Sequence, residues 1–291
     1  MQTASSDPRQ PLGRAIRKEI GGWSASLKVG AVILTLIVLA AIFAPLIAPY
    51  DPYAQDYMAI LQPPSWTHLF GTDNIGRDIF SRVLYGARID LTIGFLTTYV
   101  PMIYGVVIGA YAGYLGGRFD AVVSGIIDVA LAFPFLVLII IILAILGPGI
   151  QNVYIAVFLV AWTMYARLAR AEMMVERTKD YMTAAVVLGF PRRRVILRHG
   201  LPNVINSSIV FSATDFVLNI VLVSSLSFIG LGVQPPAPEW GAMISEGRDF
   251  IRQAWWMATL PGLAIVLTGT SLALIGDGLA RRLGERHHTV A

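Results

Sequence analysis

The chain contains no cysteine, which excludes disulfide bonds, thiol catalysis and cysteine-ligated metals. Charged residues are also scarce: they make up 14% of the 291 residues, whereas an ordinary soluble domain carries about 25%. Hydrophobic residues, in contrast, make up 56% of the chain, and the mean hydropathy is +0.66. This balance predicts an integral membrane protein.

Motifs for chemistry on a substrate are absent as well. The sequence has no phosphate-binding G-x-x-x-x-G-K-[ST], no H-E-x-x-H and no G-x-S-x-G. The neighbouring His287 and His288 fit a solvated tail better than a zinc site, which needs three well-placed ligands. We therefore expect no catalytic residue, no metal ligand and no cofactor site in this chain.

Six apolar runs are each long enough to cross about 30 Å of hydrocarbon as a helix. The first is 20 residues long, which favours a spanning helix over the shorter core of a cleavable signal peptide. The sequence thus predicts an all-α polytopic membrane protein with six transmembrane helices, at residues 29–48, 89–115, 121–146, 150–168, 204–230 and 257–280.

The basic residues predict how these helices are oriented. With the basic N-terminal tail placed in the cytoplasm, 17 of the 22 Lys and Arg residues lie on the cytoplasmic side and 5 on the opposite side. Cytoplasmic loops of membrane proteins carry such an excess. We therefore expect both termini in the cytoplasm. The same bias explains the net charge of +4 without a nucleic-acid partner.

Two spans carry patterns of their own. Gly105, Gly109, Gly113 and Gly117 recur every four residues in the second span, which predicts close packing against another helix. Pro101 and Pro134 are expected to bend their helices, with neighbouring groups satisfying the freed carbonyls.

The fifth span has a polar stripe, which consists of Ser208, Ser212, Asp215 and Asn219 at spacings of 4, 3 and 4. These spacings place the four side chains on one helix face. A polar face in a membrane must meet polar partners or water. The stripe is therefore a candidate lining of a solute pathway, and the alternative is hydrogen bonding between helices.

Two more acids, Asp128 and Asp277, lie in predicted spans near their cytoplasmic ends. Together with Asp215 they could form a proton relay. Their shallow position favours snorkelling of Asp128 and Asp277 to the interface instead.

The outer loops are long. The loop at 50–88 is Pro-rich at its start, and Asp78 and Arg82 at i,i+4 support a short helix near its end. That segment could be an interfacial helix, a solvated connector or a docking surface for an external partner. In the last outer loop, Trp255 and Trp256 are expected to anchor the sixth span in the aromatic belt of the membrane.

The one sizeable inner loop, residues 169–203, predicts two short helices. The first runs from near Lys179 to Leu188, with Gly189 as a left-handed stop. It has almost no polar face, and an apolar patch of this kind in water marks an interaction site. The second runs from Pro191 to near Gly200 and is basic and amphipathic, which suits the anionic inner leaflet or an acidic partner.

This loop, TAAVVLGFPRRRVILRHGLP, resembles the cytoplasmic "EAA---G…LP" loop of permease subunits in ATP-binding cassette (ABC) importers. Thr183 stands where that family usually has Glu, and RHGLPN at 198–203 is similar to the peptide-importer branch. The resemblance extends over most of the chain through GTDNIGRDIFSRVLYGAR, GAYAGYLGGRFD, LGPGIQN, SFIGLGVQPPAPEWGAMISEGR and LIGDGLARRLGE. The chain resembles the "C" permease subunits of oligopeptide and dipeptide importers.

The resemblance implies a type I ABC importer fold and a place in the bacterial cytoplasmic (inner) membrane. It implies four kinds of partner: a second permease subunit in a heterodimer, cytoplasmic ABC subunits that bind ATP and magnesium, an extracytoplasmic substrate-binding protein, and membrane lipids. It assigns ATPase coupling to the 180–203 loop, with the contacts carried by Asp180, Tyr181, Thr183, Ala184, Ala185, Gly189, Arg198, Leu201 and Pro202.

The sequence thus divides into a cytoplasmic tail at 1–28, a first span with its outer loop at 29–88, a five-helix core at 89–282 that includes the coupling loop 169–203, and a cytoplasmic tail at 283–291. Three alternatives stay open: a proton-coupled secondary transporter that uses Asp215 or Asp128, the same importer type carrying nickel or glutathione-like solutes, and a structural membrane subunit without a solute path.

Overall fold

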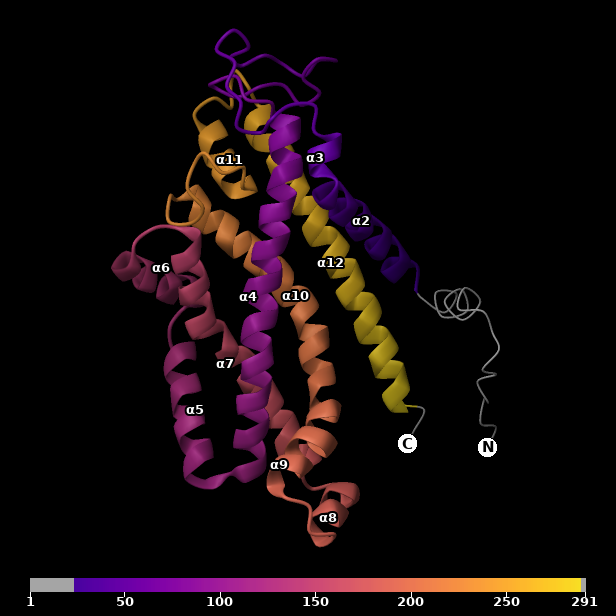
Figure 1. Ribbon diagram of the computed structural model, residues 1–291. Helices are drawn as coiled ribbons and strands as arrows, with labels where there is room; N and C mark the ends of the chain where they lie inside the picture. The colour runs from indigo at the N-terminus through magenta and orange to yellow at the C-terminus, as the bar shows by residue number, and fades with distance from the viewer. Residues whose placement is uncertain (1–23, 289–291) are drawn as a thin grey trace.

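A computed structural model describes the backbone of residues 24–288 and the side chains of residues 24–281. Residues 1–23 of the predicted N-terminal tail and residues 289–291 of the predicted C-terminal tail therefore lie outside the described residues. Within the described part the regular elements are all helical, and they form an elongated bundle (Figure 1). The helices are α2 (Ala25–Ile42), α3 (Ala44–Ile47), α4 (Ile79–Leu115), α5 (Gly117–Leu131), α6 (Phe135–Leu146), α7 (Ile150–Glu176), α8 (Asp180–Val187), α9 (Arg192–Arg194), α10 (Leu201–Phe228), α11 (Trp240–Arg248) and α12 (Trp256–His288).

Among the described residues, five helical segments are long and apolar enough to cross a membrane: α2, α4, α7, α12, and the segment Arg192–Phe228 that ends in α10. The predicted third span is not one straight helix. It is divided into α5 and α6, which meet at an angle of 89° around Pro134. Pro134 lacks the N–H that would continue the helical ladder, so the predicted bend at this residue is confirmed as a break.

The boundaries of the spans differ from the prediction, most clearly at α4, α7 and α12. α7 ends at Glu176, eight residues beyond its predicted end at 168. α4 begins at Ile79, ten residues before the predicted span, because the Asp78 carboxylate accepts the backbone N–H of Ser81 at 2.8 Å and caps the helix. The short helix expected near Asp78 and Arg82 is therefore the first part of α4. α12 continues through His288, so part of the predicted C-terminal tail is helical.

The glycine pattern explains the closest helix contact of the bundle. A Cβ atom added to Gly105, Gly109 or Gly113 would lie within 3.0 Å of the carbonyl oxygen of a residue on α7: Trp162, Ala166 and Arg170 respectively. Only residues without a side chain allow two backbones to approach so closely. The predicted packing role is confirmed for these three glycines. Gly117 differs, since it starts α5 after the turn at Gly116.

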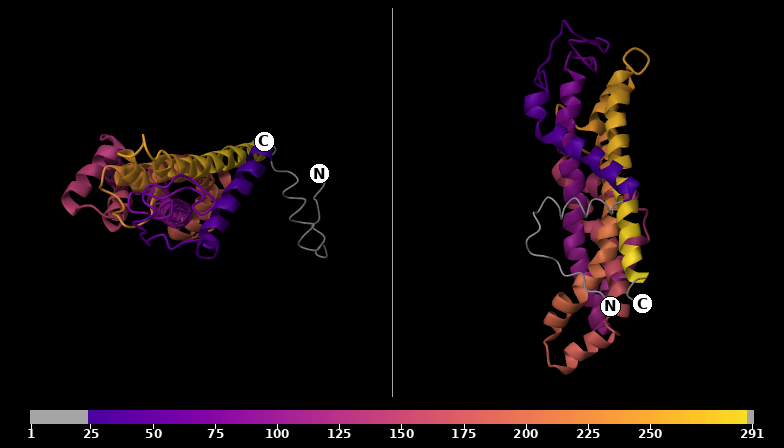
Figure 2. Two further views of the ribbon diagram at one scale, coloured as in Figure 1. Left: turned by 90° about the horizontal axis from the view of Figure 1, so that it is seen from above. Right: turned by 90° about the vertical axis from the view of Figure 1, so that its right-hand side faces the viewer.

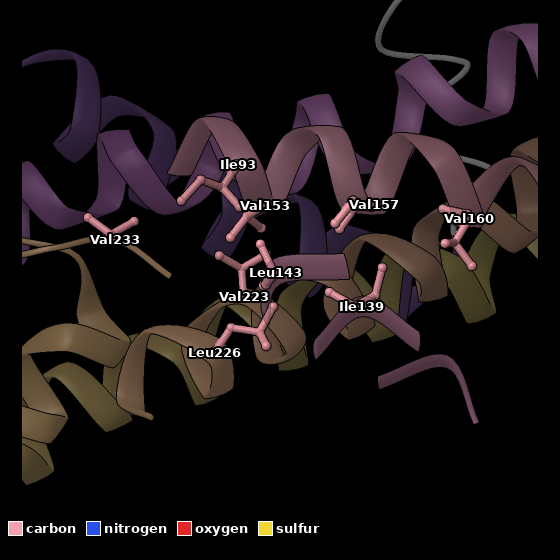
Figure 3. Packing of buried hydrophobic residues seen from close by; sticks show 11 residues of the cluster. Ile93, Ile139, Leu143, Val153, Val157, Val160, Val223, Leu226 and Val233 are labelled. Carbon is pink, nitrogen blue, oxygen red and sulfur yellow. The ribbon is translucent and has the colours of Figure 1, made fainter. Parts of the chain in front are cut away.

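The apolar core fills the space between α4, α6, α7 and α10 (Figure 3). Ile139 and Leu143 of α6 and Val153 and Val157 of α7 are fully buried there. α2 lies outside this core and packs on α12, which it crosses in Figure 2. That crossing is close because Gly30 faces the Ser271 carbonyl and Gly278 faces Leu27.

Candidate functional site

The two ends of the bundle carry different structures. The long loops 48–78 and 229–255 lie at one end, and α8 projects from the opposite end (Figure 1). With the orientation that the charge distribution predicts, α8 lies on the cytoplasmic side. This end contains the residues for which the sequence predicts coupling to a partner.

α8 ends at the residue that the sequence indicates. Gly189 has φ +78°, and the N–H of Phe190 donates to the Ala185 carbonyl at 3.2 Å while the N–H of Gly189 donates to Val186 at 2.9 Å. These two bonds form a Schellman motif, which needs a left-handed residue at the position of Gly189. The predicted helix and its stop are confirmed.

α8 has one face on the protein and one in the open. Met182 and Ala185 are buried and pack in a cluster with Met173, Val195 and Ile196. At the C-terminal end of the helix, Val186, Val187 and Leu188 are 53%, 80% and 72% exposed. Exposed branched apolar residues at the tip of a short helix form a small hydrophobic surface suited to a protein contact. We call Val186, Val187 and Leu188 the apolar tip.

The predicted coupling residues fall into two groups around this tip. Asp180, Tyr181, Thr183, Ala184, Gly189, Arg198 and Pro202 are exposed, and Leu201 is half-buried. Ala185 is buried, so this residue does not belong to the exposed interaction surface that the sequence predicts at 180–189. The physical reason is the helical period, which turns Ala185 to the same side as Met182.

Tyr181 attaches α8 to the ends of two long helices. Its hydroxyl donates to the Glu176 carboxylate at the end of α7 and accepts a hydrogen bond from Asn203 Nδ2 of α10 at 2.9 Å. Burial, followed by the hydrogen bond to Glu176, raises the pKa of Tyr181 to about 12. The tyrosine therefore stays protonated and keeps donating at physiological pH. The sequence did not indicate these two partners of Tyr181: Glu176 lies outside the recognisable loop motif, and Asn203 ends RHGLPN without a role assigned to its side chain.

The second predicted helix does not end near Gly200, so the prediction of its end is wrong. α9 passes into a π-helical segment, Val195–Gly200, which joins α10 directly at Leu201. Pro202 does not stop the chain because it occupies the first turn of α10, where no N–H donor is required. In the π-helical segment before Pro202, the backbone hydrogen bonds join residues five apart, whereas in an α-helix they join residues four apart. The basic segment is thus continuous with α10, without a loop between them.

The polar stripe faces other helices of the same chain. Asp215 accepts hydrogen bonds from the hydroxyl of Tyr165 on α7 at 2.8 Å and from Asn219 Nδ2 at 3.0 Å. Asn219 Nδ2 also lies 3.0 Å from Thr98 Oγ1 of α4. Ser208, Ser212 and Asn219 are buried. In this conformation the stripe connects α10 with α4 and α7, as the helix-to-helix alternative expects, and its role as a pathway lining stays a prediction. Asp128 and Asp277 lie on exposed helix faces.

The opposite end of the bundle contains a largely buried ion-pair network that the sequence did not reveal. Glu246 of α11 accepts from Arg77 at 2.8 Å and from Arg82 at 2.9 Å, and Arg77 also pairs with Asp73 at 2.5 Å. The Trp256 ring is buried and its Nε1 donates to the Thr72 carbonyl at 3.1 Å. The expected membrane anchor at Trp256 is therefore wrong: this ring joins α12 to the outer loop, while Trp255 is exposed.

These features define a class of protein: a polytopic membrane bundle with long packed loops at one end and a projecting helix with an exposed apolar tip at the other. Residues 105–287 match the family described as "Binding-protein-dependent transport system inner membrane component". Residues 28–64 match the "N-terminal TM domain of oligopeptide transport permease C". The chain belongs to this family of ABC transporter permeases, and it is a multi-pass inner-membrane protein.

Curated relatives cover almost the whole chain. The "Di/tripeptide transport system permease protein DppC" of Pseudomonas aeruginosa is 42% identical over 263 residues, which is 88% of this chain and 87% of the relative. The "Dipeptide transport system permease protein DppC" of Escherichia coli is 43% identical over 264 residues, covering 89% and 88%. The "Probable D,D-dipeptide transport system permease protein DdpC" of Escherichia coli is 41% identical over 249 residues, covering 86% and 84%. The resemblance inferred from the loop motifs is thereby confirmed.

Proposed function

We propose that this chain is one of two permease subunits in an ATP-driven importer of dipeptides or oligopeptides. The names of the relatives support the cargo, since those compared above are called dipeptide or di/tripeptide permeases. The family description supports an extracytoplasmic binding protein as a partner. ATP and magnesium would be bound by partner ATPase subunits, because this sequence contains no phosphate-binding loop.

The observation that carries the coupling part of the proposal is the structure of α8. Its apolar tip is exposed, while Tyr181 and Met182 attach the same helix to the ends of α7 and α10. A partner that covers the tip can therefore move both helices with it. This is a rigid-body switch of the kind used in alternating access, with the two arrangements of the permease pair as its states.

Uptake by the reconstituted complex tests the proposal. The permease pair and its ATPase are placed in proteoliposomes, the binding protein is added outside, and labelled dipeptides, tripeptides and longer peptides are supplied. We expect uptake only with ATP and magnesium on the ATPase side, and no loss of uptake with a protonophore. Uptake that survives ATP depletion and stops with the protonophore would instead support a proton-coupled transporter. If the complex imports nickel or glutathione-like solutes with ATP but imports no peptide, the proposed cargo is wrong and the ATP-driven mechanism stands.

A further inference from the structure

A basic cleft lies beside α8, on the side away from the most exposed part of the tip. It has a volume of about 420 Å³ and is lined by Tyr114 and Leu115 at the end of α4, Arg177 and Thr178 before α8, Val186 of α8, and Arg192 of α9. Val187 and Leu188, the two most exposed residues of the tip, do not line it. The cleft and the apolar tip therefore share Val186 but are otherwise lined by different residues.

The two arginines of this cleft lack a carboxylate partner among the side chains of residues 24–281. Arg177 donates one N–H to the Tyr114 carbonyl at 3.1 Å, and neither Arg177 nor Arg192 forms an ion pair. The nearby acids have other partners. Asp120 makes two bonds with Arg170, at 2.5 and 2.8 Å, and Glu176 pairs with Lys179 at 2.7 Å. Asp180 is exposed at the start of α8 and does not line the cleft. The cleft thus carries an excess of two positive charges.

The position of the cleft indicates what balances these charges. Leu115 is the last residue of the apolar helix α4, and Gly116 and Gly117 turn the chain there. Tyr111 and Tyr114 occupy the last two turns of α4, and Phe119 is exposed in the first turn of α5. Aromatic residues gather at the level of the lipid headgroups, and the cytoplasmic leaflet is rich in anionic lipids. In a membrane oriented as the charge distribution predicts, these residues place the cleft at the depth of the phosphates, with apolar walls at Leu115 and Val186.

We propose that this cleft binds the headgroup of an anionic phospholipid, with Arg177 and Arg192 donating to its phosphate. Guanidinium groups bind phosphate oxygens through paired N–H donors. The bound headgroup connects the end of α4 to the base of α8, and so fixes the position of α8 relative to the membrane surface. This proposal concerns lipid binding by the chain and does not rest on the proposed function.

Counting bound lipid on the purified complex tests the proposal. The delipidated complex is incubated with equal amounts of phosphatidylglycerol and phosphatidylcholine, and mass spectrometry of the intact complex counts the lipids that remain bound. A titration then gives the apparent Kd of phosphatidylglycerol. Arg192→Gln should weaken that binding roughly 5-fold and Arg177→Gln with Arg192→Gln about 30-fold, since each basic group near an anionic surface contributes a comparable amount. Arg193→Gln is the matched control, because Arg193 follows Arg192 in the chain, is exposed and does not line the cleft.

Three results would overturn the proposal. Equal weakening by Arg192→Gln and Arg193→Gln would show diffuse attraction without a site. Displacement of the lipid by millimolar inorganic phosphate would show a site for the free anion. Unchanged lipid binding in the double variant, together with loss of the ATPase subunits during purification, would show that the arginines meet an acidic protein surface. A thermal midpoint equal to that of the control confirms that each variant is folded. If the double variant does not fold, the comparison of Arg192→Gln with Arg193→Gln still tests the proposal, because Arg192 is exposed.

Discussion

Replacing Gly109 by alanine adds a single methyl group, and the structure predicts a large effect for so small a change. The added Cβ would lie 2.8 Å from the Ala166 carbonyl carbon and 2.8 Å from its Cα, and closer still to its oxygen. All three atoms belong to the backbone of α7, so no side chain can rotate away. Because ordinary carbon contacts begin at 3.4 Å, α4 and α7 must separate by more than half an ångström. Overpacking of this kind costs about 1–3 kcal/mol.

Thermal unfolding in detergent measures this cost. A loss of about 2 kcal/mol corresponds to a decrease of roughly 4–8 °C in Tm for a chain of this size. Gly125→Ala is the matched control, because Gly125 is also helical and an added Cβ there has no heavy atom within 4 Å. The control should retain or slightly raise the Tm, since alanine favours a helix over glycine. Equal midpoints for the two variants would refute the close packing of α4 against α7.

Two further predictions concern the two ends of the bundle. Glu246→Ala leaves Arg77 and Arg82 buried without their shared partner, which costs about 3 kcal/mol and lowers the Tm by roughly 6–12 °C. The control is Asp249→Ala, which removes an exposed ion pair worth at most about 1 kcal/mol. An equal decrease in Tm for both variants would contradict the network. Tyr181→Phe removes hydrogen bonds of α8, so hydrogen exchange should report easier opening of α8 by about 1–2 kcal/mol. The pKa of Tyr181 is raised to about 12 by burial and its hydrogen bond, so its contribution is complete below pH about 10 and is lost as the pH rises through about 12. The difference from the phenylalanine variant should therefore be constant between pH 6 and 9, and a change across that range would contradict the assignment.

Sequence patterns predicted the parts of this fold that depend on neighbours along the chain. Long apolar runs located the spans, and the spacing of Gly105, Gly109 and Gly113 gave the face of α4 that meets α7. Gly189 gave the end of α8, since few other residues adopt its left-handed conformation. Each of these inferences needs only local geometry and the thickness of the membrane.

Features that depend on distant partners could not be predicted in the same way. The sequence shows that the polar stripe shares one helix face, but not that Tyr165 and Thr98 lie opposite it. Likewise, Glu246 is 164 residues from Arg82, and no spacing rule connects them. Because Ser212 and Asn219 are buried, bulky substitutions there would disturb helix packing as well as any solute path.

The sequence predicted the break between α5 and α6 only in part. Pro134 indicated a bend, but the angle of 89° depends on how α6 packs. Ile139 and Leu143 of α6 are buried against α7 and α10, so tertiary contacts determine the direction in which the helix leaves the break.

We propose that the apolar tip of α8 receives the movement of the ATPase. Val187 is 80% exposed, so Val187→Asp should change the stability of the permease by no more than about 0.5 kcal/mol. In a partner's apolar groove, however, the same change removes a buried side chain worth about 1.5–3 kcal/mol and places a charge there. Val187→Leu at the same position keeps the apolar contact and serves as the control.

The direct measurement is the number of peptides imported per ATP hydrolysed in proteoliposomes, with Tm and membrane insertion measured on the same preparations. Our account predicts that Val187→Asp lowers this ratio at least 10-fold at unchanged Tm, and that Val187→Leu retains it. A Val187→Asp complex that imports peptide with the full yield per ATP would contradict the assignment of α8 as the coupling helix.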